Sequence, residues 1–255
     1  MTTQAIIERI RQKDWTLLEE DGAIGPEAAP AIRPLLGDDD PEIRELAVHC
    51  LAAAGDGQGR EGVLEALRND SEMARSAACR CLEANPDPQD LPQLTVEVTS
   101  NPDAFVRESV ARALGVIGDA NATEALKRQI ATEVDPADRH AMALALARLN
   151  EPAYRGQYLA RLHQGEPAER ARAVGEFPYV GGRDLLGELL PLLDDTEEAL
   201  NVGPSNVKRK IRVCDVVVNV LDAMLDHPFS FPTGRRIRYS QAQLDEAKQR
   251  IGQGR

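Results

Sequence analysis

The sequence predicts an all-α protein built as an α-solenoid, a stack of short helix pairs, and three observations lead to this prediction. Arginine recurs at separations of 31, 32, 32 and 31 residues, at Arg44, Arg75, Arg107, Arg139 and Arg170. A large apolar residue stands seven positions after each arginine, about two helical turns further along the same face. An Asp, Asn or Glu followed by Pro opens four of these units, and this pair is typical of a helix start. A near-constant period of this length indicates a repeat architecture.

The first element should be an N-terminal cap over residues 1–26. A helix is predicted at 3–20, and its apolar residues, such as Ile6 and Ile10, would cover the open end of the stack, where the first repeat has no neighbour. Trp15 lies in this segment and is predicted to belong to the cap rather than to a binding site.

The repeats should follow over residues 27–226. Each is expected to consist of helix A, a tight acidic turn, helix B and a short loop, giving about six pairs near 27–54, 58–84, 88–118, 121–149, 152–178 and 182–226. The last pair departs from this pattern, because an acidic insertion at 194–206 delays its second helix to about Val207. The insertion is interpreted either as a loop without regular structure or as a loop that contacts a partner.

Residues 227–255 should form a C-terminal cap. Phe229 and Phe231 alternate like a short strand, and a capping-box motif that starts at Ser240 should open a last helix over 241–251. We expect the whole segment to fold back over the last helices, because terminal repeats need a covering.

The charge of the 255-residue chain is strongly uneven. The formal net charge is −12, with −17 over residues 1–200 and +5 over residues 201–255, so the acidic part would repel nucleic acid and anionic membranes. We expect no signal peptide, because the first residues lack a basic stretch followed by an apolar one, and no apolar run reaches the roughly 18 residues that a membrane span needs. Four cysteines in so long a chain do not suggest a disulfide framework. We therefore expect one domain, residues 1–255, of a monomeric, cytoplasmic protein of bacterial type.

Two motifs, Asp-Pro-Glu-Ile-Arg at 40–44 and Val-Arg-Glu-Ser-Val-Ala-Arg-Ala-Leu-Gly at 106–115, resemble HEAT-like repeats. They are similar in particular to the short bacterial class related to the phycobilisome-lyase repeats, and the resemblance extends over roughly residues 27–226. It implies a right-handed α-solenoid. The resemblance implies no set of catalytic residues for this chain, because function on a repeat fold depends on the sites that the fold carries.

No catalytic, cofactor-binding or metal-binding residue is predicted. The sequence has no phosphate-binding Gly-Lys-Ser/Thr loop, no Gly-x-Ser-x-Gly motif and no dinucleotide fingerprint. HEAT-like di-iron hydroxylases resemble this fold but carry His-Glu pairs, and none of the four histidines here is followed by Glu. HEAT-like DNA glycosylases need a basic groove, whereas this chain is acidic. We therefore expect a protein that is not an enzyme and that has no cofactor or metal.

The turns between helices A and B are acidic and should align along one edge of the stack, where they could recognise a basic partner. Two groups of residues are predicted to contact a partner. The first consists of acidic residues that helix capping does not require, and the second of three arginines in the C-terminal cap: Asp38, Asp39, Asp194, Asp195, Glu197 and Glu198, and Arg235, Arg236 and Arg238. The five repeating arginines, the arginine ladder, are instead predicted to be structural. Each should pair with an acidic turn of its own or of a neighbouring unit.

The predicted function is non-enzymatic binding of another protein through the solenoid surface, as a scaffold or adaptor or as an immunity-type inhibitor of a basic toxin. The alternative, implied by the resemblance to phycobilisome-lyase repeats, is an enzyme or enzyme accessory of the HEAT-like lyase type. A nucleic-acid role is less favoured and is confined to the last 55 residues, where the net charge is positive.

Overall fold

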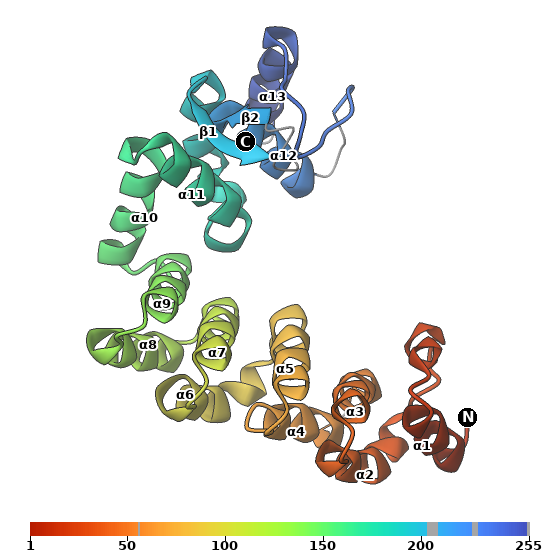
Figure 1. Cartoon of the computed structure of the whole chain (residues 1–255). Coiled ribbons are helices and arrows are strands. Elements are labelled where there is room, and N and C mark those ends of the chain that lie inside the picture. Colours follow the sequence, from red (N-terminus) through yellow and green to blue (C-terminus); the bar gives the residue numbers. More distant parts are fainter. Residues whose placement is uncertain (56, 203–208, 226–228, 254–255) are drawn as a thin grey trace. The chain divides into compact units, whose positions relative to one another are not determined.

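The computed structural model describes residues 1–55, 57–202, 209–225 and 229–253. The chain forms two compact units, Met1–Leu149 (unit 1) and Asn150–Arg255 (unit 2), whose elements are labelled in Figure 1. No helix of the described residues is long and apolar enough to cross a lipid bilayer. The division of residues 1–255 into one domain with two caps stays a prediction.

Unit 1 consists of short helices in the predicted order. Its α-helices and 3-10 helices are α1 (Thr3–Arg11), η1 (Trp15–Glu19), η2 (Pro26–Ala28), α2 (Ala29–Ile32), η3 (Arg33–Gly37), α3 (Pro41–Ala54), α4 (Gly57–Ala66), α5 (Glu72–Ala84), η4 (Pro88–Asp90), α6 (Leu91–Ser100), α7 (Ala104–Ile117), α8 (Ala120–Thr132) and α9 (Pro136–Arg148). The single helix expected over 3–20 is wrong. Lys13 adopts a left-handed φ of 58°, which ends the first helix, and Asp14 then caps η1 by accepting a hydrogen bond from the Thr16 amide.

The helices of unit 1 form two rows, as predicted for a helical solenoid. The A helices α2, α4, α6 and α8 make one row and the B helices α3, α5, α7 and α9 make the other (Figure 1). Successive B helices pack on one another, and each also packs on its own A helix. The apolar residue seven positions after each ladder arginine is buried between the rows, at Leu51, Leu82, Leu114 and Leu146. This burial confirms the core that the repeat period predicts.

Four of the five ladder arginines pair with a carboxylate of the next repeat, as expected: Arg44, Arg75, Arg107 and Arg170. Arg139 departs from the expectation and donates to the backbone carbonyl groups of Glu133 (2.9 Å) and Ile130 (3.4 Å). Arg75 donates to the carbonyl oxygen of Asn69 in its own turn (2.8 Å) and pairs with Asp103 in the next turn (2.6 Å). Arg107 does the same one repeat later, with the Asn101 carbonyl at 2.9 Å and Asp138 at 2.6 Å. Each of these guanidinium groups therefore ties two successive turns together, using its several donors on one carbonyl and one carboxylate.

Unit 2 begins with one pair of α-helices and then departs from the repeat pattern. Its elements are α10 (Pro152–Gln164), α11 (Pro167–Val180), η5 (Arg183–Leu189), η6 (Pro191–Asp194), β1 (Glu198–Val202), β2 (Arg209–Arg212), α12 (Val213–Met224) and α13 (Gln241–Gln253). The helix α13 is close to the predicted 241–251. Arg170 continues the ladder here, with the Gly165 carbonyl at 2.6 Å and Asp195 at 2.7 Å.

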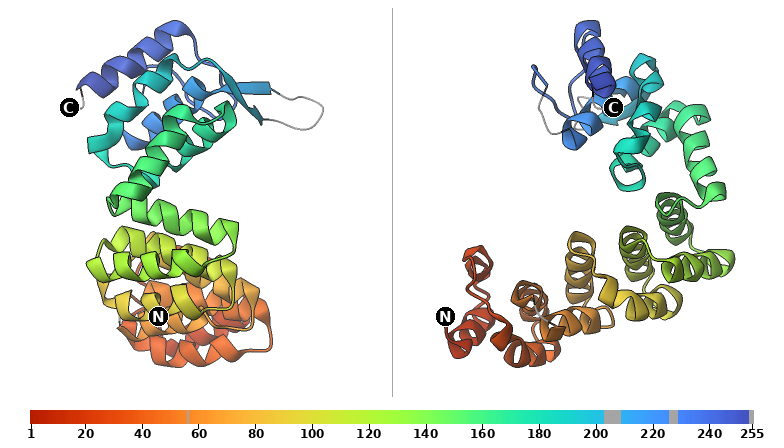
Figure 2. Two further views of the ribbon diagram at one scale, coloured as in Figure 1. Left: turned by 90° about the vertical axis from the view of Figure 1, so that its left-hand side faces the viewer. Right: turned by 180° about the vertical axis from the view of Figure 1, so that it is seen from behind.

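The insertion in the last repeat contains a β-hairpin, which corrects the sequence-based expectation of a loop. Strands β1 and β2 pair antiparallel with Leu200 opposite Ile211, and in Figure 2 the hairpin extends from the helices of unit 2. The Ile211 side chain is buried while its neighbour Lys210 is exposed, the alternation of a strand with one covered face. The second helix therefore begins at Val213, and the predicted start at Val207 lies outside the described residues.

The C-terminal segment is joined to α12 and α13 by hydrogen bonds, such as Thr233 to Asp222 and Ser230 to Glu246, and its aromatic rings stack on one another where the sequence predicts a strand. The rings of Phe229 and Phe231 are stacked at 5.0 Å, and Tyr239 is tilted against Phe231 at 5.6 Å. Asn219 stands where the repeat pattern expects a large apolar residue. It accepts hydrogen bonds from the Tyr239 hydroxyl (2.7 Å) and the Gly234 amide (3.0 Å), so this exception in the pattern anchors the terminal segment.

Candidate functional site

The B helices of unit 1 expose one row of side chains each. On α7 the exposed and half-buried positions Phe105, Glu108, Arg112 and Val116 recur every three or four residues, which places them on a single helical face. The opposite face of the same helix is buried in the core between the rows. Because α3, α5, α7 and α9 are neighbours, these exposed faces together form one surface, the B-helix face.

One edge of the B-helix face combines exposed apolar side chains with carboxylates. Met73 and Phe105 are the second residues of α5 and α7 and are 41% and 48% exposed, and Val134, in the turn before α9, is 88% exposed. Asp70 and Glu72 lie in the same row of turns, and the Asp70 side chain remains 82% exposed although it pairs with Arg44. We call these five residues the turn-edge strip: Asp70, Glu72, Met73, Phe105 and Val134. Exposed apolar side chains gathered in this way are typical of interaction surfaces.

The net negative charge of the protein comes from unit 1. Unit 1 holds 15 Lys and Arg against 27 Asp and Glu, a formal net charge of −12, whereas unit 2 holds 15 of each and is neutral. The turn-edge strip therefore belongs to the half of the chain whose field attracts cations.

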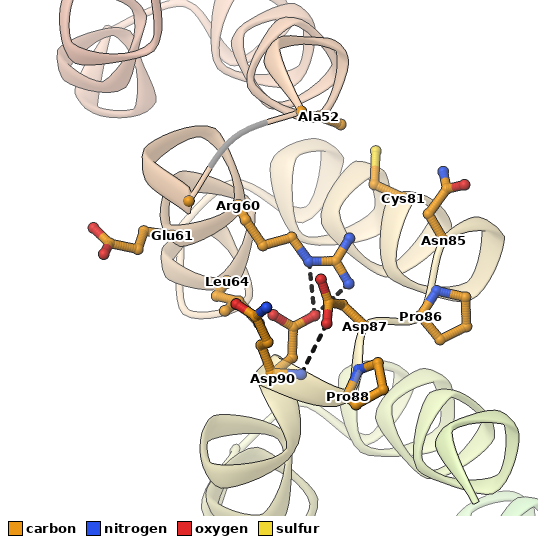
Figure 3. A pocket seen from close by; sticks show the side chains of 13 residues that line it. Ala52, Arg60, Glu61, Leu64, Cys81, Asn85, Pro86, Asp87, Pro88 and Asp90 are labelled. Carbon is orange, nitrogen blue, oxygen red and sulfur yellow. Dashed lines mark hydrogen bonds and ion pairs between the residues drawn. The ribbon is translucent and has the colours of Figure 1, made fainter. Parts of the chain in front are cut away.

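A cavity of about 1040 Å³ lies at the other end of the B helices of the first two repeats (Figure 3). It is lined by the ends of α3 and α5, the start of α4 and the loop 85–90. Inside it the Arg60 guanidinium pairs with Asp90, with 2.7 Å between Nε and Oδ2, and Asp90 is only 4% exposed. A buried carboxylate held by a guanidinium in a fixed geometry gives the cavity a polar, rigid floor.

A cysteine and a histidine meet beside this cavity. The Sγ atom of Cys81, a residue that lines the cavity, is 3.8 Å from Nδ1 of His49, whose ring packs edge-on against Trp15 at 5.7 Å. Burial raises the pKa of the Cys81 thiol and lowers the pKa of the His49 imidazole. Both groups are thus neutral at pH 7, and a neutral thiol is a weak nucleophile. In the described part of the chain, no group of three or more His, Cys, Asp or Glu residues is placed to hold a metal ion.

Four of the six acidic residues predicted to contact a partner form ion pairs within unit 2. Asp194 pairs with Lys248, Asp195 and Glu197 with Arg170, and Glu198 with Lys210 at 2.8 Å. Glu198 also approaches Arg238 at 3.6 Å, so the structure joins two of the segments that the sequence singled out. Each of these four carboxylates therefore has a structural role, whatever else it contacts.

The other predicted contact residues lie at the surface. Asp39 is exposed at the first A-to-B turn of unit 1, next to Asp38, which accepts a hydrogen bond from the Asp40 amide at 3.0 Å. Arg235 and Arg236 are exposed in the C-terminal segment of unit 2. The prediction that all of these residues bind a partner stays a prediction.

Sequence reasoning missed Met73 and Phe105. Apolar residues in a helical pattern are assigned to the core by default, and both were passed over for this reason. One signal in the sequence could have indicated their exposure. Both stand two residues before a ladder arginine, and the first repeat has a polar residue, Glu42, at this position. Glu42 is half-buried and accepts a hydrogen bond from the Trp15 indole.

Comparison with known proteins agrees with the repeat architecture. Residues 60–147 match the family model described as HEAT repeats. The chain therefore has a HEAT-like repeat fold. Among solved structures it is similar to a chain of the complex of CpcE and CpcF of phycocyanin lyase from Nostoc sp. PCC7120, at 18% sequence identity and a TM-score of 0.52, with 99% of this chain and 94% of that chain covered. The comparison with curated proteins gave no match.

The structural likeness requires one correction. The sequence predicted that this HEAT-like repeat protein is not an enzyme, because no nucleophile or acid–base pair could be found. The similar chain belongs to a lyase complex, and it matches over nearly the whole length. This finding points against the non-enzymatic prediction. Catalytic motifs are a poor guide here, since HEAT-like repeats carry their function on surfaces that have no fixed sequence signature.

Proposed function

We propose that this HEAT-like repeat protein works as a subunit or accessory of a lyase-type enzyme and that it holds a protein partner on its solenoid surface. The observation that carries the proposal is the likeness in fold, over 99% of this chain, to a chain from a complex of two proteins that make up a phycocyanin lyase. An α-solenoid presents a broad surface suited to a macromolecular partner.

The chemistry of unit 1 supports an accessory role. Cys81 and His49 are neutral and lie 3.8 Å apart, so they do not form an activated nucleophile and base. The adjoining cavity has a polar floor in the Arg60–Asp90 pair and is about 1040 Å³ in volume, the size of a site for a small molecule. In the proposed role the cavity holds the group that is attached or removed, while the solenoid surface positions the protein that carries it.

The proposal is tested with the protein expressed at native level in its source organism with an affinity tag. A partner protein should co-purify in fixed stoichiometry. Intact-mass spectrometry should then show that the isolated complex adds a group to this partner or removes one from it. An isolated chain without a partner, or a partner of unchanged mass, would contradict the proposal.

A variant of the cavity makes the test more specific. Asn85 is exposed, ends α5 and lines the cavity, so that Asn85→Trp should fill the cavity and abolish the mass change while the complex still forms. Gln12 is likewise exposed and ends α1, and Gln12→Trp is the matched control that should retain the activity. Equal activity of both variants would show that the cavity has no part in the reaction.

A further inference from the structure

The apolar side chains of the turn-edge strip recur once per helix pair. Met73, Phe105 and Val134 belong to three successive A-to-B turns and are all substantially exposed. Met73 and Phe105 stand at equivalent positions, two residues before Arg75 and Arg107, on the packed helices α5 and α7, so they lie roughly 8–10 Å apart. Val134 stands five residues before Arg139 and adds exposed apolar surface to the next turn at a different position of the repeat. The strip thus offers two apolar anchors in register and a third apolar side chain beyond them.

We propose that the turn-edge strip docks a basic, amphipathic α-helix of a partner protein, laid across the turns with an apolar residue at every seventh position. The inference rests on the proposed function, of which it specifies the partner surface. Seven residues of an α-helix rise about 10.5 Å, which matches the spacing of packed neighbouring helices. Apolar residues at i and i+7 of the partner would then meet Met73 and Phe105 in register, and the helix would continue toward the turn that carries Val134.

The backbone of the turns favours a helix over an extended segment as the occupant. An extended peptide must find partners for its own amides and carbonyls, usually at an exposed sheet edge. The turns already use their own groups, since Asp103 caps the Phe105 amide at 2.9 Å and Asp135 caps the Ala137 amide at 2.8 Å. A helix satisfies its backbone internally and needs only side-chain contacts.

Charge complementarity determines the sign of the partner. The exposed carboxylates of Asp70 and Glu72 lie beside Met73, and unit 1 as a whole carries a net charge of −12. Lys or Arg residues that flank the apolar positions of the partner helix would face this field. Carboxylates at the rim of an apolar contact raise the association rate and select against acidic partners.

The test uses the full chain and fluorescently labelled synthetic peptides. The first peptide is a helix-forming sequence with Leu at every seventh position and Lys on both sides of each Leu. The second has the same composition in scrambled order, and the third has Leu at every third position with prolines that prevent a helix. Fluorescence anisotropy should show that the first peptide binds at least about tenfold more tightly than the other two, because only its anchors are in register.

Variants of the strip identify the contact. Met73→Asp together with Phe105→Asp should weaken binding of the first peptide at least about tenfold. Val96→Asp is the matched control, because Val96 is a comparably exposed apolar residue, at 52%, on the A helix α6, and it should leave the affinity unchanged. Equal binding of all three peptides, or equal affinity of both variants, would overturn the proposal in favour of unspecific attraction by charge. If the native complex keeps its activity when the strip is altered, the strip is not the surface that binds the partner, and the proposed function still stands.

Discussion

Replacement of Arg107 by alanine is the sharpest test of the arginine ladder. The Arg107 guanidinium donates to the Asn101 carbonyl at 2.9 Å and pairs with Asp138 at 2.6 Å and Glu133 at 3.3 Å. Both carboxylates are nearly inaccessible, with Asp138 1% and Glu133 6% exposed. Arg107→Ala therefore leaves two buried negative charges of the next repeat without this cation.

The expected cost is large because the charges that remain are buried. Removal of one partner from a buried ion pair destabilises a protein by about 3–5 kcal/mol, whereas an exposed pair contributes about 1 kcal/mol or less. Arg80 offers the matched control: it pairs with Glu45 in the neighbouring repeat at 2.8 Å, but its side chain is 55% exposed. Arg80→Ala should therefore reduce the free energy of unfolding by no more than about 1 kcal/mol.

The assay is urea unfolding followed by fluorescence. The chain has one tryptophan, Trp15, which lies in unit 1 and therefore reports on the unit that contains Arg107. A second substitution, Asp138→Asn, should recover part of the loss in the Arg107→Ala background, because it removes one of the unpaired charges. If Arg107→Ala costs no more than Arg80→Ala, the ladder does not hold the repeats together and the reasoning fails.

Two further predictions concern ionisable groups. Burial raises the pKa of Asp138 to about 6 from its ordinary value of 3.8, so the folded state binds more protons than the unfolded state between these values. The free energy of unfolding should therefore fall by about 2 kcal/mol as the pH rises from 4 to 6. Asp138→Asn should lack this fall in urea titrations at the two pH values, and an equal fall in both proteins would contradict the prediction. The second prediction concerns the four cysteines, of which only Cys81 lines the cavity. The other three are buried, and burial raises the pKa of Cys50 and Cys79 to about 12 and that of Cys214 to about 11, so their thiols are neither accessible nor ionised at pH 7. A thiol reagent should therefore modify Cys81 alone in the folded protein, slowly at pH 7, and labelling of any other cysteine before unfolding would show that these side chains are not buried as described.

The helix pairs could be predicted because their determinants are local in sequence. The ladder arginine, the buried leucine seven residues later and the capping residue before the helix all lie within one helix and its turn, as at Asp103, Arg107 and Leu114. The β-hairpin could not be predicted in this way. Its strands are only four and five residues long, and they depend on pairing with each other and on packing against α11, which lies earlier in the chain.

The candidate contact residues were predicted less well, for an electrostatic reason. An acidic residue that does not cap a helix appears in the sequence to have no partner, because the Lys or Arg that pairs with it can lie far away along the chain. Asp194 pairs with Lys248, 54 residues later, and Asp195 with Arg170, 25 residues earlier. The exposed anchors Met73 and Phe105 were missed for the converse reason, since exposure of an apolar helical residue depends on where the neighbouring repeats lie.

The ladder and the proposed docking surface are two consequences of one geometry. Arg75 joins its own turn, at Asn69, to Asp103 in the next turn, and Asp103 in turn caps the amide of Phe105. Met73 lies between Asn69 and Arg75 in sequence, so this single guanidinium fixes the separation of the two apolar anchors. A partner helix whose apolar residues stand seven positions apart can contact both anchors only if this separation is held. Interactions that appear purely structural in the sequence therefore also determine what the surface can recognise.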